Sequence, residues 1–398
     1  MPISRSSTLT LGALAGALTL SSSYPAAAQQ DAPIKIGVVA TLSGPGANVG
    51  RQIRDGFNLA IKDLNGKMGN RKVEVFVIDD ELKPDVAVTK VKGLLERDKV
   101  DFVVGPVFGN VLLAIEKPIS ASQVFLISPN SGPSNLAGKA CSPYFFVTSY
   151  QNDQVSQILG KVAQERGYKR VYVLVPNYQG GKDAVAGFKT DFKGEVVEES
   201  YVPLNTLDFQ SELSKIAALN PDAIFTFMPG GMGVNLVKQY RQAGLADSIP
   251  FLSAFTVDEM TLPAQRSAAL GMFGGANWAP NLDLPQSKQF VSAYEAAYNT
   301  VPGATGFQAY DAAMLIDSAV RATNGDLSDK KAVRAALKRA DFKSLRGSFK
   351  FNTNGYPIQD FYLVKAALRP DGKFQTEIVQ KIFSNSADQF AKDCTIND

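Results

Sequence analysis

The sequence predicts an α/β fold with two lobes, and three observations lead to that class. Short apolar segments alternate with helical segments, which is the pattern of a parallel sheet with right-handed crossovers. This pattern runs twice, first over residues 34–128 and again over residues 152–275. The chain has 398 residues, more than one hydrophobic core usually organises, so we expect two units of similar size.

The N-terminus is predicted to be a signal peptide that covers residues 1–28. Arg5 supplies a short positive region, and Leu9–Leu20 is an apolar segment too short to span a bilayer. Ala26-Ala27-Ala28 is a small-residue cleavage site, so the mature chain of about 370 residues would start at Gln29. We therefore expect the protein to be exported.

The first α/β unit is expected to hold four strands, each followed by a helix or a turn. A glycine-rich turn precedes the first helix, and the second helix carries valine and leucine on one face. The strands are expected at Ile34–Ala40, Val73–Ile78, the start of Val100–Leu113 and Val124–Ser128, and the helices at Arg51–Asn65 and Pro84–Asp98.

The second unit repeats this wiring without a residue-level repeat. Its strands are expected at Arg170–Val175, Val196–Tyr201, Ala223–Phe227, Phe251–Ser253 and Met272–Gly275, and its helices at Asn152–Gly167, Lys182–Phe192, Phe209–Leu219 and Met232–Ala243. After Trp278 come three helices and a hairpin, expected at Pro285–Tyr298, Gly306–Ala322, Lys330–Ala340, Gly347–Phe351 and Asp360–Ala366, with a last strand at Gln375–Phe383. No strand is expected between these three helices, which suggests that they return to cover the first unit.

The turns that follow the predicted strands indicate a ligand cleft. In Val100–Leu113 a strand ends at Gly105 and a helix starts near Asn110, which leaves backbone N–H groups at the sheet's carboxyl edge. Residues 128–132 (SPNSG) form a similar turn on the neighbouring strand. Residues 177–180 and 228–231 are the corresponding turns of the second unit, so two facing sets of turns would define a cleft between the lobes.

Composition excludes several function classes. The chain has no histidine, which excludes a Ser-His-Asp triad, a Cys-His pair and any histidine metal site. Its net charge of +3 gives no reason to expect nucleic acid as a partner. The glycines at 44–50 do not match the spacing of a dinucleotide fingerprint, and Asp79-Asp80 has no third metal ligand nearby. We therefore expect no cofactor, no metal and no catalysis.

Cys141 and Cys394 are the only two cysteines. In an oxidising compartment such a pair usually forms a disulfide, which here would close a long loop and hold the C-terminal tail. Two buried free thiols are the alternative.

Several motifs, in this order and spacing, resemble the branched-chain amino acid (Leu/Ile/Val)-binding family of periplasmic solute-binding proteins of ABC importers. The motifs are Ile36–Gly46, Asp79-Asp80, Val103–Pro106, Ile127–Asn130, Asp208-Phe209, Pro221-Asp222, Gln242–Leu245, Tyr310-Asp311-Ala312 and Gly347–Phe351. The resemblance covers essentially the whole mature chain. It implies two Rossmann-like lobes of the type I periplasmic binding protein, a three-segment hinge, and a ligand trapped by hinge closure.

The resemblance also implies the domain boundaries and the partners. Lobe 1 would comprise residues 29–148 and 278–352, and lobe 2 residues 149–277 and 353–398. The crossings would lie near Thr148–Gln151, Gly275–Trp278 and Phe351–Tyr356. The partners would be a small-molecule ligand and a membrane permease, with no nucleic acid, and we expect a periplasmic monomer.

The sequence departs from the amino-acid binders of this family. Those proteins hold the ligand's carboxylate with hydroxyl side chains in two turns, and the matching positions here are Gly109 and Gly132. Their acid for the ligand's ammonium is matched by Phe255, and an ammonium without a partner in a closed cleft would be costly. The sequence resembles instead the branch of the family that takes aromatic carboxylates.

We therefore expect a receptor for a small organic acid, and specifically for an aromatic carboxylate of the benzoate or phenylpropanoid type. The alternatives are a branched-chain or other amino acid in the same fold, with another acid replacing the lost one, and an exported NAD-type dehydrogenase. The expected ligand-binding residues lie near turns and crossings: Phe108, Gly109, Asn110, Asn130, Ser131, Gly132, Tyr150, Tyr178, Gln179, Pro229, Gly230, Phe255, Trp278, Phe307 and Gln308.

Overall fold

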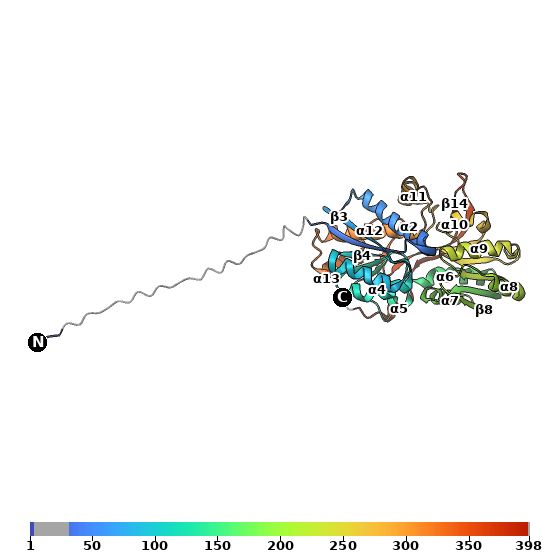
Figure 1. The fold of residues 1–398 in the computed structure, drawn as a ribbon, viewed down its shortest axis with the longest axis horizontal. Coiled ribbons are helices and arrows are strands. Elements are labelled where there is room, and N and C mark those ends of the chain that lie inside the picture. Colours follow the sequence, from blue (N-terminus) through green and yellow to red (C-terminus); the bar gives the residue numbers. More distant parts are fainter. Residues whose placement is uncertain (4–31, 397–398) are drawn as a thin grey trace.

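Two open β-sheets, one in each lobe, organise the chain in a computed structural model that describes residues 1–3 and 32–396 (Figure 1). We call the part around the six-stranded sheet lobe 1 and the part around the eight-stranded sheet lobe 2. The predicted cleavage site and all but the first three residues of the predicted signal peptide lie outside the described residues. The alternation of strands and helices expected from the sequence is present in both lobes.

The sheet of lobe 1 has the strand order β2-β3-β1-β4-β5-β6. Its central strands are apolar and buried on both faces, as in β1 (IKIGVVA), because helices cover both sides of a parallel sheet. The strands are β1 (Ile34–Ala40), β2 (Lys67–Met68), β3 (Arg71–Asp79), β4 (Phe102–Val104), β5 (Phe125–Ser128) and β6 (Phe145–Val147). All pairs are parallel except the β2–β3 hairpin. Neither β2 nor β6 was predicted, because segments of two and three residues show no usable periodicity.

The sheet of lobe 2 has the order β12-β13-β11-β10-β9-β7-β8, with β14 paired to β13. Strands β7 to β11 are parallel, and the C-terminal hairpin adds antiparallel strands at one edge. The strands are β7 (Arg170–Pro176), β8 (Glu195–Val202), β9 (Ala223–Phe227), β10 (Phe251–Ala254), β11 (Phe273–Ala276), β12 (Lys350–Phe351), β13 (Pro357–Leu368) and β14 (Phe374–Ser386).

Helices cover both faces of each sheet, and a hydrophobic cluster fills each helix–sheet interface. In lobe 1 the helices are α2 (Ala47–Asp63), α3 (Pro84–Gly93), α4 (Gly109–Ala121), α5 (Ser134–Ala137), α11 (Pro285–Tyr298), α12 (Ala304–Ala322) and α13 (Lys330–Arg339). In lobe 2 they are α6 (Asn152–Glu165), α7 (Gln179–Asp191), α8 (Gln210–Leu219), α9 (Gly231–Gln242) and α10 (Leu262–Gln265). Helix α12 packs against α2, so the late helices return to lobe 1 as predicted.

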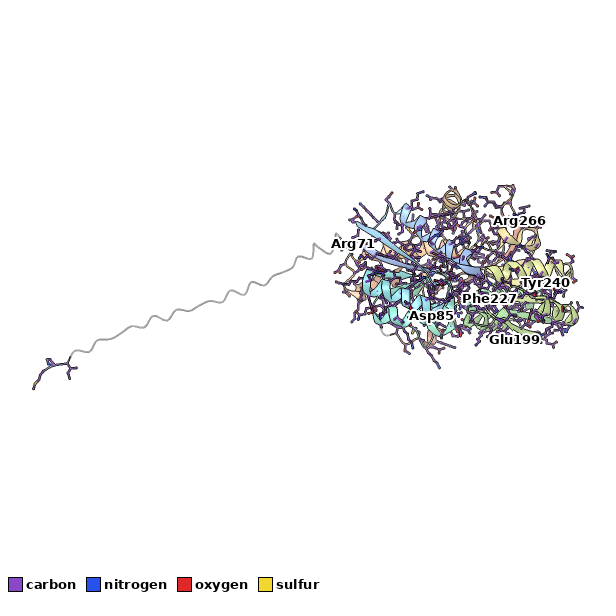
Figure 2. The ribbon with its side chains drawn as sticks, in the orientation of Figure 1. Arg71, Asp85, Glu199, Phe227, Tyr240 and Arg266 are labelled. Atoms are coloured by element: carbon purple, nitrogen blue, oxygen red, sulfur yellow. A yellow bond between two sulfur atoms is a disulfide. The ribbon has the colours of Figure 1, made fainter. Side chains whose placement is uncertain are left out.

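The chain passes between the two sheets three times. It leaves β6 for α6 through residues 148–151, leaves β11 for α11 after Ala276, and returns from α13 to β13. Figure 2 shows where labelled side chains lie in the two lobes. Arg71 lies at the far end of lobe 1, Tyr240 lies in lobe 2, and Phe227 lies close to the junction between the lobes. Several short passages between two rigid units are the usual construction of a hinge.

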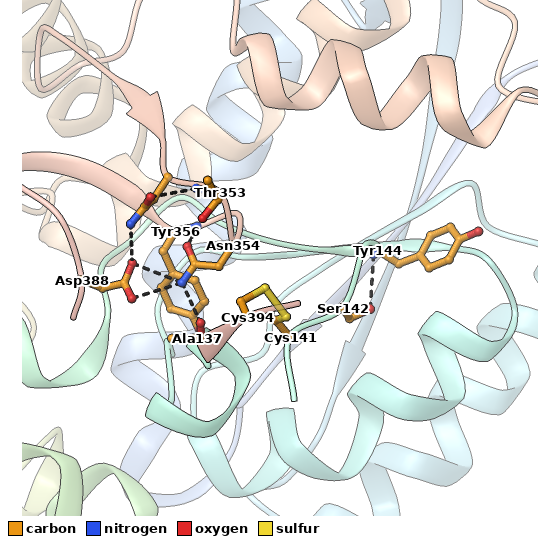
Figure 3. Close-up of a disulfide and its surroundings, with 10 residues drawn as sticks. Ala137, Cys141, Ser142, Tyr144, Thr353, Asn354, Tyr356, Asp388 and Cys394 are labelled. Carbon is orange, nitrogen blue, oxygen red and sulfur yellow. Dashed lines mark hydrogen bonds between the residues drawn. A yellow bond between two sulfur atoms is a disulfide. The ribbon is translucent and has the colours of Figure 1, made fainter. Parts of the chain in front are cut away.

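The C-terminal tail forms a further, covalent connection between the lobes (Figure 3). Cys394 is bonded to Cys141 in lobe 1, with 5.7 Å between their Cα atoms. On the way from β14, the Asp388 carboxylate accepts hydrogen bonds from Asn352 and Asn354, and the ring of Phe390 joins the core of lobe 1. Cys394 and Phe390 therefore lie against the core of lobe 1, where the disulfide to Cys141 holds the end of the chain.

Within the described residues, no helix is long and apolar enough to cross a membrane. The same residues contain no group of three acidic or cysteine side chains that could hold a metal ion.

Candidate ligand-binding site

A cavity lies between the lobes, where the carboxyl ends of the two sheets face each other. It contains about 600 Å³ of space between the side chains, part of which is open to solvent. Nine of the fifteen residues predicted to bind ligand line it: Phe108, Gly109, Asn130, Ser131, Tyr150, Tyr178, Pro229, Gly230 and Phe255. Nine others that sequence reasoning missed complete the wall: Val49, Val107, Asn152, Ser156, Gly180, Ala184, Phe227, Asp258 and Met260.

The lobe 1 wall is built around the N-terminus of α4. Phe108 is the extended N-cap residue, and Gly109 opens the helix, so the first amides of the helix have no intrahelical acceptor. A Cβ atom on Gly109 would lie 3.1 Å from the hydroxyl oxygen of Ser131, so this hydroxyl lies directly beside the helix end. The backbone N–H groups and the Ser131 hydroxyl together form a set of donors suited to an anion.

In the turn after β5, Gly132 cannot bind a ligand carboxylate as the matching position of the amino-acid binders does. The Gly132 N–H group donates a hydrogen bond to Asn152 Oδ1 at 2.8 Å, so it is not available to a ligand. A Cβ atom on Gly132 would lie 2.0 Å from the carbonyl oxygen of Tyr150. Glycine is required here because the crossing segment approaches so closely, and a hydroxyl side chain could not occupy this position.

Asn130 also has a structural role in this turn. Its amide Nδ2 donates to the Val107 carbonyl at 2.6 Å, and its Oδ1 accepts from the Tyr150 hydroxyl at 2.8 Å. Because the Tyr150 hydroxyl directs its proton to Asn130, it can accept a hydrogen bond from a ligand but cannot donate one.

Five aromatic rings surround the cavity. The rings of Tyr150 and Phe255 are stacked at 4.9 Å between centroids, and Phe227 lies 6.1 Å from both Phe255 and Tyr178. Phe108 of lobe 1 approaches Tyr178 of lobe 2 at 6.4 Å. Phe227 was not predicted to bind ligand, because a phenylalanine at the end of an apolar strand is typical of a hydrophobic core. Rings placed on both sides of a cleft favour a flat apolar ligand.

Three hydroxyl groups belong to residues of the cavity wall and have no partner among the described residues. The hydroxyls of Ser131, Ser156 and Tyr178 make no hydrogen bond to any residue in the described part of the chain. Burial raises the pKa of Tyr178 far above its usual value, so this hydroxyl stays protonated. These groups can donate to a ligand or accept from it.

Asp258 is the acidic residue among those that line the cavity, and no motif in the sequence predicted it there. Its Oδ1 accepts hydrogen bonds from the N–H groups of Met260 and Thr261, at 3.0 and 3.1 Å, and from the Thr261 hydroxyl at 3.0 Å. Desolvation by burial raises its pKa to about 6. Phe255, three residues earlier, has a left-handed backbone with φ of 52°, so the chain bends there and Asp258 returns to the cavity.

The helix ends at the cavity wall favour the binding of an anion. Four helices of more than one turn begin at its wall, because Gly109, Asn152, Gly180 and Gly230 lie at or next to the first residues of α4, α6, α7 and α9. The N-terminus of a helix carries a partial positive charge. No lysine or arginine lines the cavity among the described residues, so these helix ends are its source of positive potential.

The lobes contact each other across the cavity mouth. A Cβ atom on Gly230 of lobe 2 would lie 2.8 Å from the carbonyl oxygen of Pro45 in lobe 1. The Ser134 hydroxyl of lobe 1 donates to Asp183 of lobe 2 at 2.8 Å. The structure therefore describes a closed arrangement of the lobes.

Six predicted ligand-binding residues do not line the cavity: Asn110, Gly132, Gln179, Trp278, Phe307 and Gln308. The indole of Trp278 is buried in lobe 1, where it donates to the Ser287 hydroxyl at 2.8 Å and packs on Phe307. Gln179 donates to Asp183 at 2.8 Å. The position of an aromatic residue near a crossing does not reveal on which side of the crossing its ring lies.

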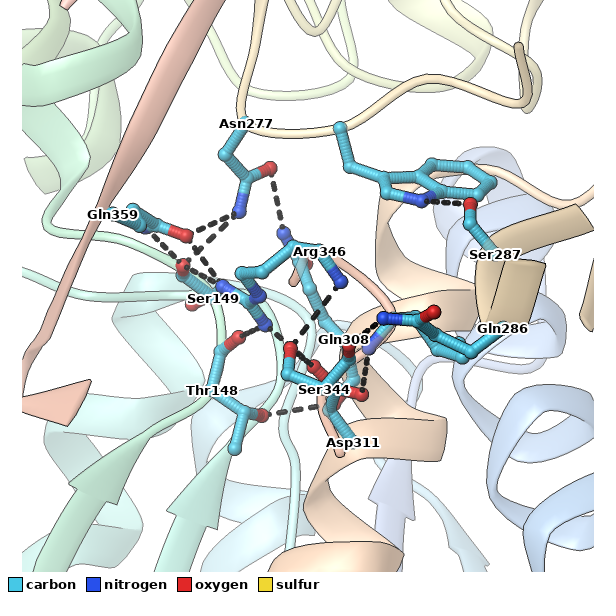
Figure 4. A network of polar contacts seen from close by, with 12 residues as sticks. Thr148, Ser149, Asn277, Gln286, Ser287, Gln308, Asp311, Ser344, Arg346 and Gln359 are labelled. Carbon is cyan, nitrogen blue, oxygen red and sulfur yellow. Dashed lines mark hydrogen bonds and ion pairs between the residues drawn. The ribbon is translucent and has the colours of Figure 1, made fainter. Parts of the chain in front are cut away.

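Gln308 belongs to a buried polar network at the hinge, which we call the hinge network (Figure 4). Its members come from α12 and all three crossings: Thr148, Ser149, Asn277, Gln308, Asp311, Ser344, Arg346 and Gln359. The Arg346 guanidinium pairs with Asp311 at 3.2 Å and donates to the carbonyl oxygens of Thr148 and Ser149. It also lies over the Phe307 ring, 4.7 Å from the centroid. This network connects the three crossings to one another.

The two sheets, the crossings and the enclosed cavity define a two-lobed, ligand-trapping receptor. A family model described as "Periplasmic binding protein" matches residues 33–373. The chain therefore belongs to the periplasmic binding protein family, and it is a solute-binding protein of the Leu/Ile/Val-binding type that serves ABC transporters. A relative from Brucella melitensis, "Leu/Ile/Val-binding protein homolog 6", is 30% identical over 87% of this chain and 91% of its own length.

Solved structures of ABC transporter solute-binding proteins show the same fold. One from R. palustris, in complex with benzoate, is 31% identical with a TM-score of 0.86, over 92% of this chain and 100% of that chain. Another, from Rhodopseudomonas palustris BisB5 in complex with 3,4-dihydroxybenzoic acid, is 30% identical with a TM-score of 0.84, over 90% and 99%. A leucine-binding protein from Thermotoga maritima, 21% identical with a TM-score of 0.76 over 86% and 97%, shares the fold.

Proposed function

We propose that this solute-binding protein takes a small aromatic carboxylate, of the benzoate or phenylpropanoid type, in the cavity between its lobes. The observation that carries the proposal is the pairing of five aromatic rings with the donors at the N-terminus of α4. The ring of the ligand would lie among Phe108, Tyr178, Phe227 and Phe255. Its carboxylate would accept hydrogen bonds from the backbone N–H group of Gly109 and from the Ser131 hydroxyl.

Closure would occur because the ligand contacts both lobes at once. A ligand shifts the lobes toward the closed form only through its higher affinity for that form. The donors of α4 belong to lobe 1, whereas Tyr178 and Phe255 belong to lobe 2. In this proposal the protein is a periplasmic monomer without cofactor, and its closed form delivers the acid to a membrane permease.

The solved relatives support the aromatic ligand, since two of them at 30–31% identity are described as complexes with benzoate and 3,4-dihydroxybenzoic acid. A second candidate, an amino acid ligand, is favoured by one specific observation. Asp258 brings a carboxylate into the cavity, where it could pair with the ammonium of an amino acid.

A thermal-shift comparison separates the two candidates. The protein is melted with benzoate, 4-hydroxybenzoate, cinnamate, leucine or valine at matched concentrations. A ligand at 100 times its Kd adds about 2.7 kcal/mol to the free energy of unfolding. We expect a shift with at least one aromatic acid. A shift with leucine and none with any aromatic acid would contradict the proposal and favour the second candidate.

A further inference from the structure

We infer that Asp258 is a specificity-determining residue that selects aromatic acids carrying a hydrogen-bond donor, such as a phenolic hydroxyl, on the ring. This inference rests on the proposed function and narrows it, from aromatic carboxylates in general to hydroxylated ones. It depends on a difference between the two carboxylate oxygens of Asp258: the protein donates hydrogen bonds to Oδ1 and none to Oδ2.

The first oxygen of Asp258 has no capacity left for a ligand. Its Oδ1 accepts from the N–H groups of Met260 and Thr261 and from the Thr261 hydroxyl, all at 3.0–3.1 Å. These three bonds fix the side chain to its own loop. The carboxylate therefore cannot turn away from the cavity without losing them.

The second oxygen is free. No described residue donates a hydrogen bond to Asp258 Oδ2, although Asp258 lines the cavity. A nearly buried carboxylate oxygen without a donor is unfavourable, because desolvation is not compensated. The missing donor must come from water or from the ligand that replaces it.

The ligand's own charge makes this requirement selective. An unsubstituted benzoate brings a second anion into a cavity whose described wall has no lysine or arginine. A ring hydroxyl compensates by donating to Oδ2, and a charge-assisted bond of this kind is shorter and stronger than a neutral one. A site built to pair with a ligand hydroxyl discriminates against the analogue that lacks it.

The test compares benzoate with 2-, 3- and 4-hydroxybenzoate by isothermal titration calorimetry. In the natural protein we expect at least one hydroxylated isomer to bind about tenfold or more tighter than benzoate. Asp258→Asn keeps the Oδ1 acceptor and replaces the free oxygen with an amide donor. We expect this variant to bring the affinities for benzoate and the preferred isomer to within about threefold.

Glu259→Gln is the matched control. Glu259 is the neighbouring buried acid, but its carboxylate accepts from Thr376 at 2.6 Å and does not line the cavity. This variant should retain the preference for the hydroxylated acid. If benzoate and all three isomers bind the natural protein equally, or if the preference survives in Asp258→Asn, the inference is wrong and the proposed function stands. If no aromatic acid binds, the proposed function fails and the inference fails with it.

The pH dependence of binding provides a test that needs no variant. Between about pH 5 and pH 8 the ligand's carboxylate stays ionised while Asp258, with a pKa raised to about 6, changes charge. Benzoate should bind more tightly as the pH falls and Asp258 becomes neutral, and the hydroxylated acid should lose its advantage. Two titratable groups, Tyr150 and Glu259, interact with Asp258. Tyr150 stays neutral over this pH range because burial raises its pKa. The contribution of Glu259 to the pH profile is removed by measuring the Glu259→Gln variant. Parallel pH profiles for the two ligands would overturn the inference.

Discussion

The cavity and the hinge network are both polar, but they use their polar groups in opposite ways. In the hinge network most polar groups satisfy one another: Arg346 pairs with Asp311 and donates to the carbonyls of the first crossing, and of its described side-chain atoms only Arg346 Nε and the Ser149 hydroxyl are buried without a partner. In the cavity, by contrast, the hydroxyls of Ser131 and Tyr178 have no protein partner in the described chain. A buried group without a partner is unfavourable unless a ligand supplies one.

Residues whose hydrogen bonds are satisfied within the protein hold the lobes together, whereas residues with an unpaired hydroxyl are available to bind a ligand. Both regions contain aromatic and amide side chains near the crossings, so residue type alone does not distinguish them. Trp278 and Gln308 were predicted to bind ligand, yet their polar atoms bond to Ser287 and Asn277. Substitutions in the hinge network should therefore change stability, and substitutions in the cavity should change affinity.

The largest effect is expected from Arg346→Met. The variant leaves Asp311 as an unpaired buried carboxylate, which costs about 3–5 kcal/mol of folding free energy. Urea unfolding of the ligand-free protein measures it. The double variant Arg346→Met/Asp311→Leu should recover a large part of the loss, because it removes the stranded charge. A loss below about 1 kcal/mol in the single variant would mean that the ion pair does not stabilise the hinge.

The second largest effect is expected from removing the disulfide with Cys141→Ser/Cys394→Ser. The bond joins residues 253 positions apart, and its loss should lower the free energy of unfolding by about 2–5 kcal/mol. Neither cysteine lines the cavity, so the ligand affinity of the folded variant should change by less than about threefold. Stability that is identical with and without the disulfide would show that the tail is held by its other contacts.

A third prediction compares two aromatic residues. Phe255→Glu places an anion in the cavity and removes the ring stacked on Tyr150, so we expect affinity for an aromatic acid to fall at least about tenfold. Trp278→Phe removes the bond to Ser287 and should lower the melting temperature while affinity stays within about threefold. Calorimetric titration of both variants with an aromatic acid measures the two affinities. Unchanged affinity in Phe255→Glu would remove Phe255 from the site.

The smallest effect is expected from Gly109→Ala. The new methyl group would lie 3.1 Å from the Ser131 hydroxyl and crowd the end of α4, so affinity for an aromatic acid should fall about two- to tenfold. Alanine is the better helix former, by up to about 1 kcal/mol, so the ligand-free protein should not become less stable. Tighter binding by this variant would argue against a carboxylate beside Gly109.

Much of the fold could be predicted from the sequence, because strands such as β1 are uniformly apolar and the intervening helices carry one apolar face. The turns after β4, β5, β7 and β9 were located by their glycine, proline and asparagine residues. The short strands β2 and β6 were missed, since two or three residues carry no period.

The candidate site was harder to predict at the level of individual side chains. Asp258 reaches the cavity only because the backbone at Phe255 turns left-handed, and nothing in the residue types around it signals that bend. Gly132 was matched, through the family resemblance, to a position that binds the ligand's carboxylate, whereas in the structure its N–H group donates a hydrogen bond to Asn152. Which hydrogen bonds are already satisfied is a property of the packed structure and not of the turn sequence.

The most direct measurement is a crystal structure of the protein with 4-hydroxybenzoate bound. We expect the ring to lie among Phe108, Tyr178, Phe227 and Phe255, with its carboxylate at the Gly109 N–H group and the Ser131 hydroxyl and its ring hydroxyl within hydrogen-bond distance of Asp258. The hinge network should remain intact and make no contact with the ligand. A ligand held by Arg346 or Gln308, or a carboxylate placed away from the end of α4, would contradict the account.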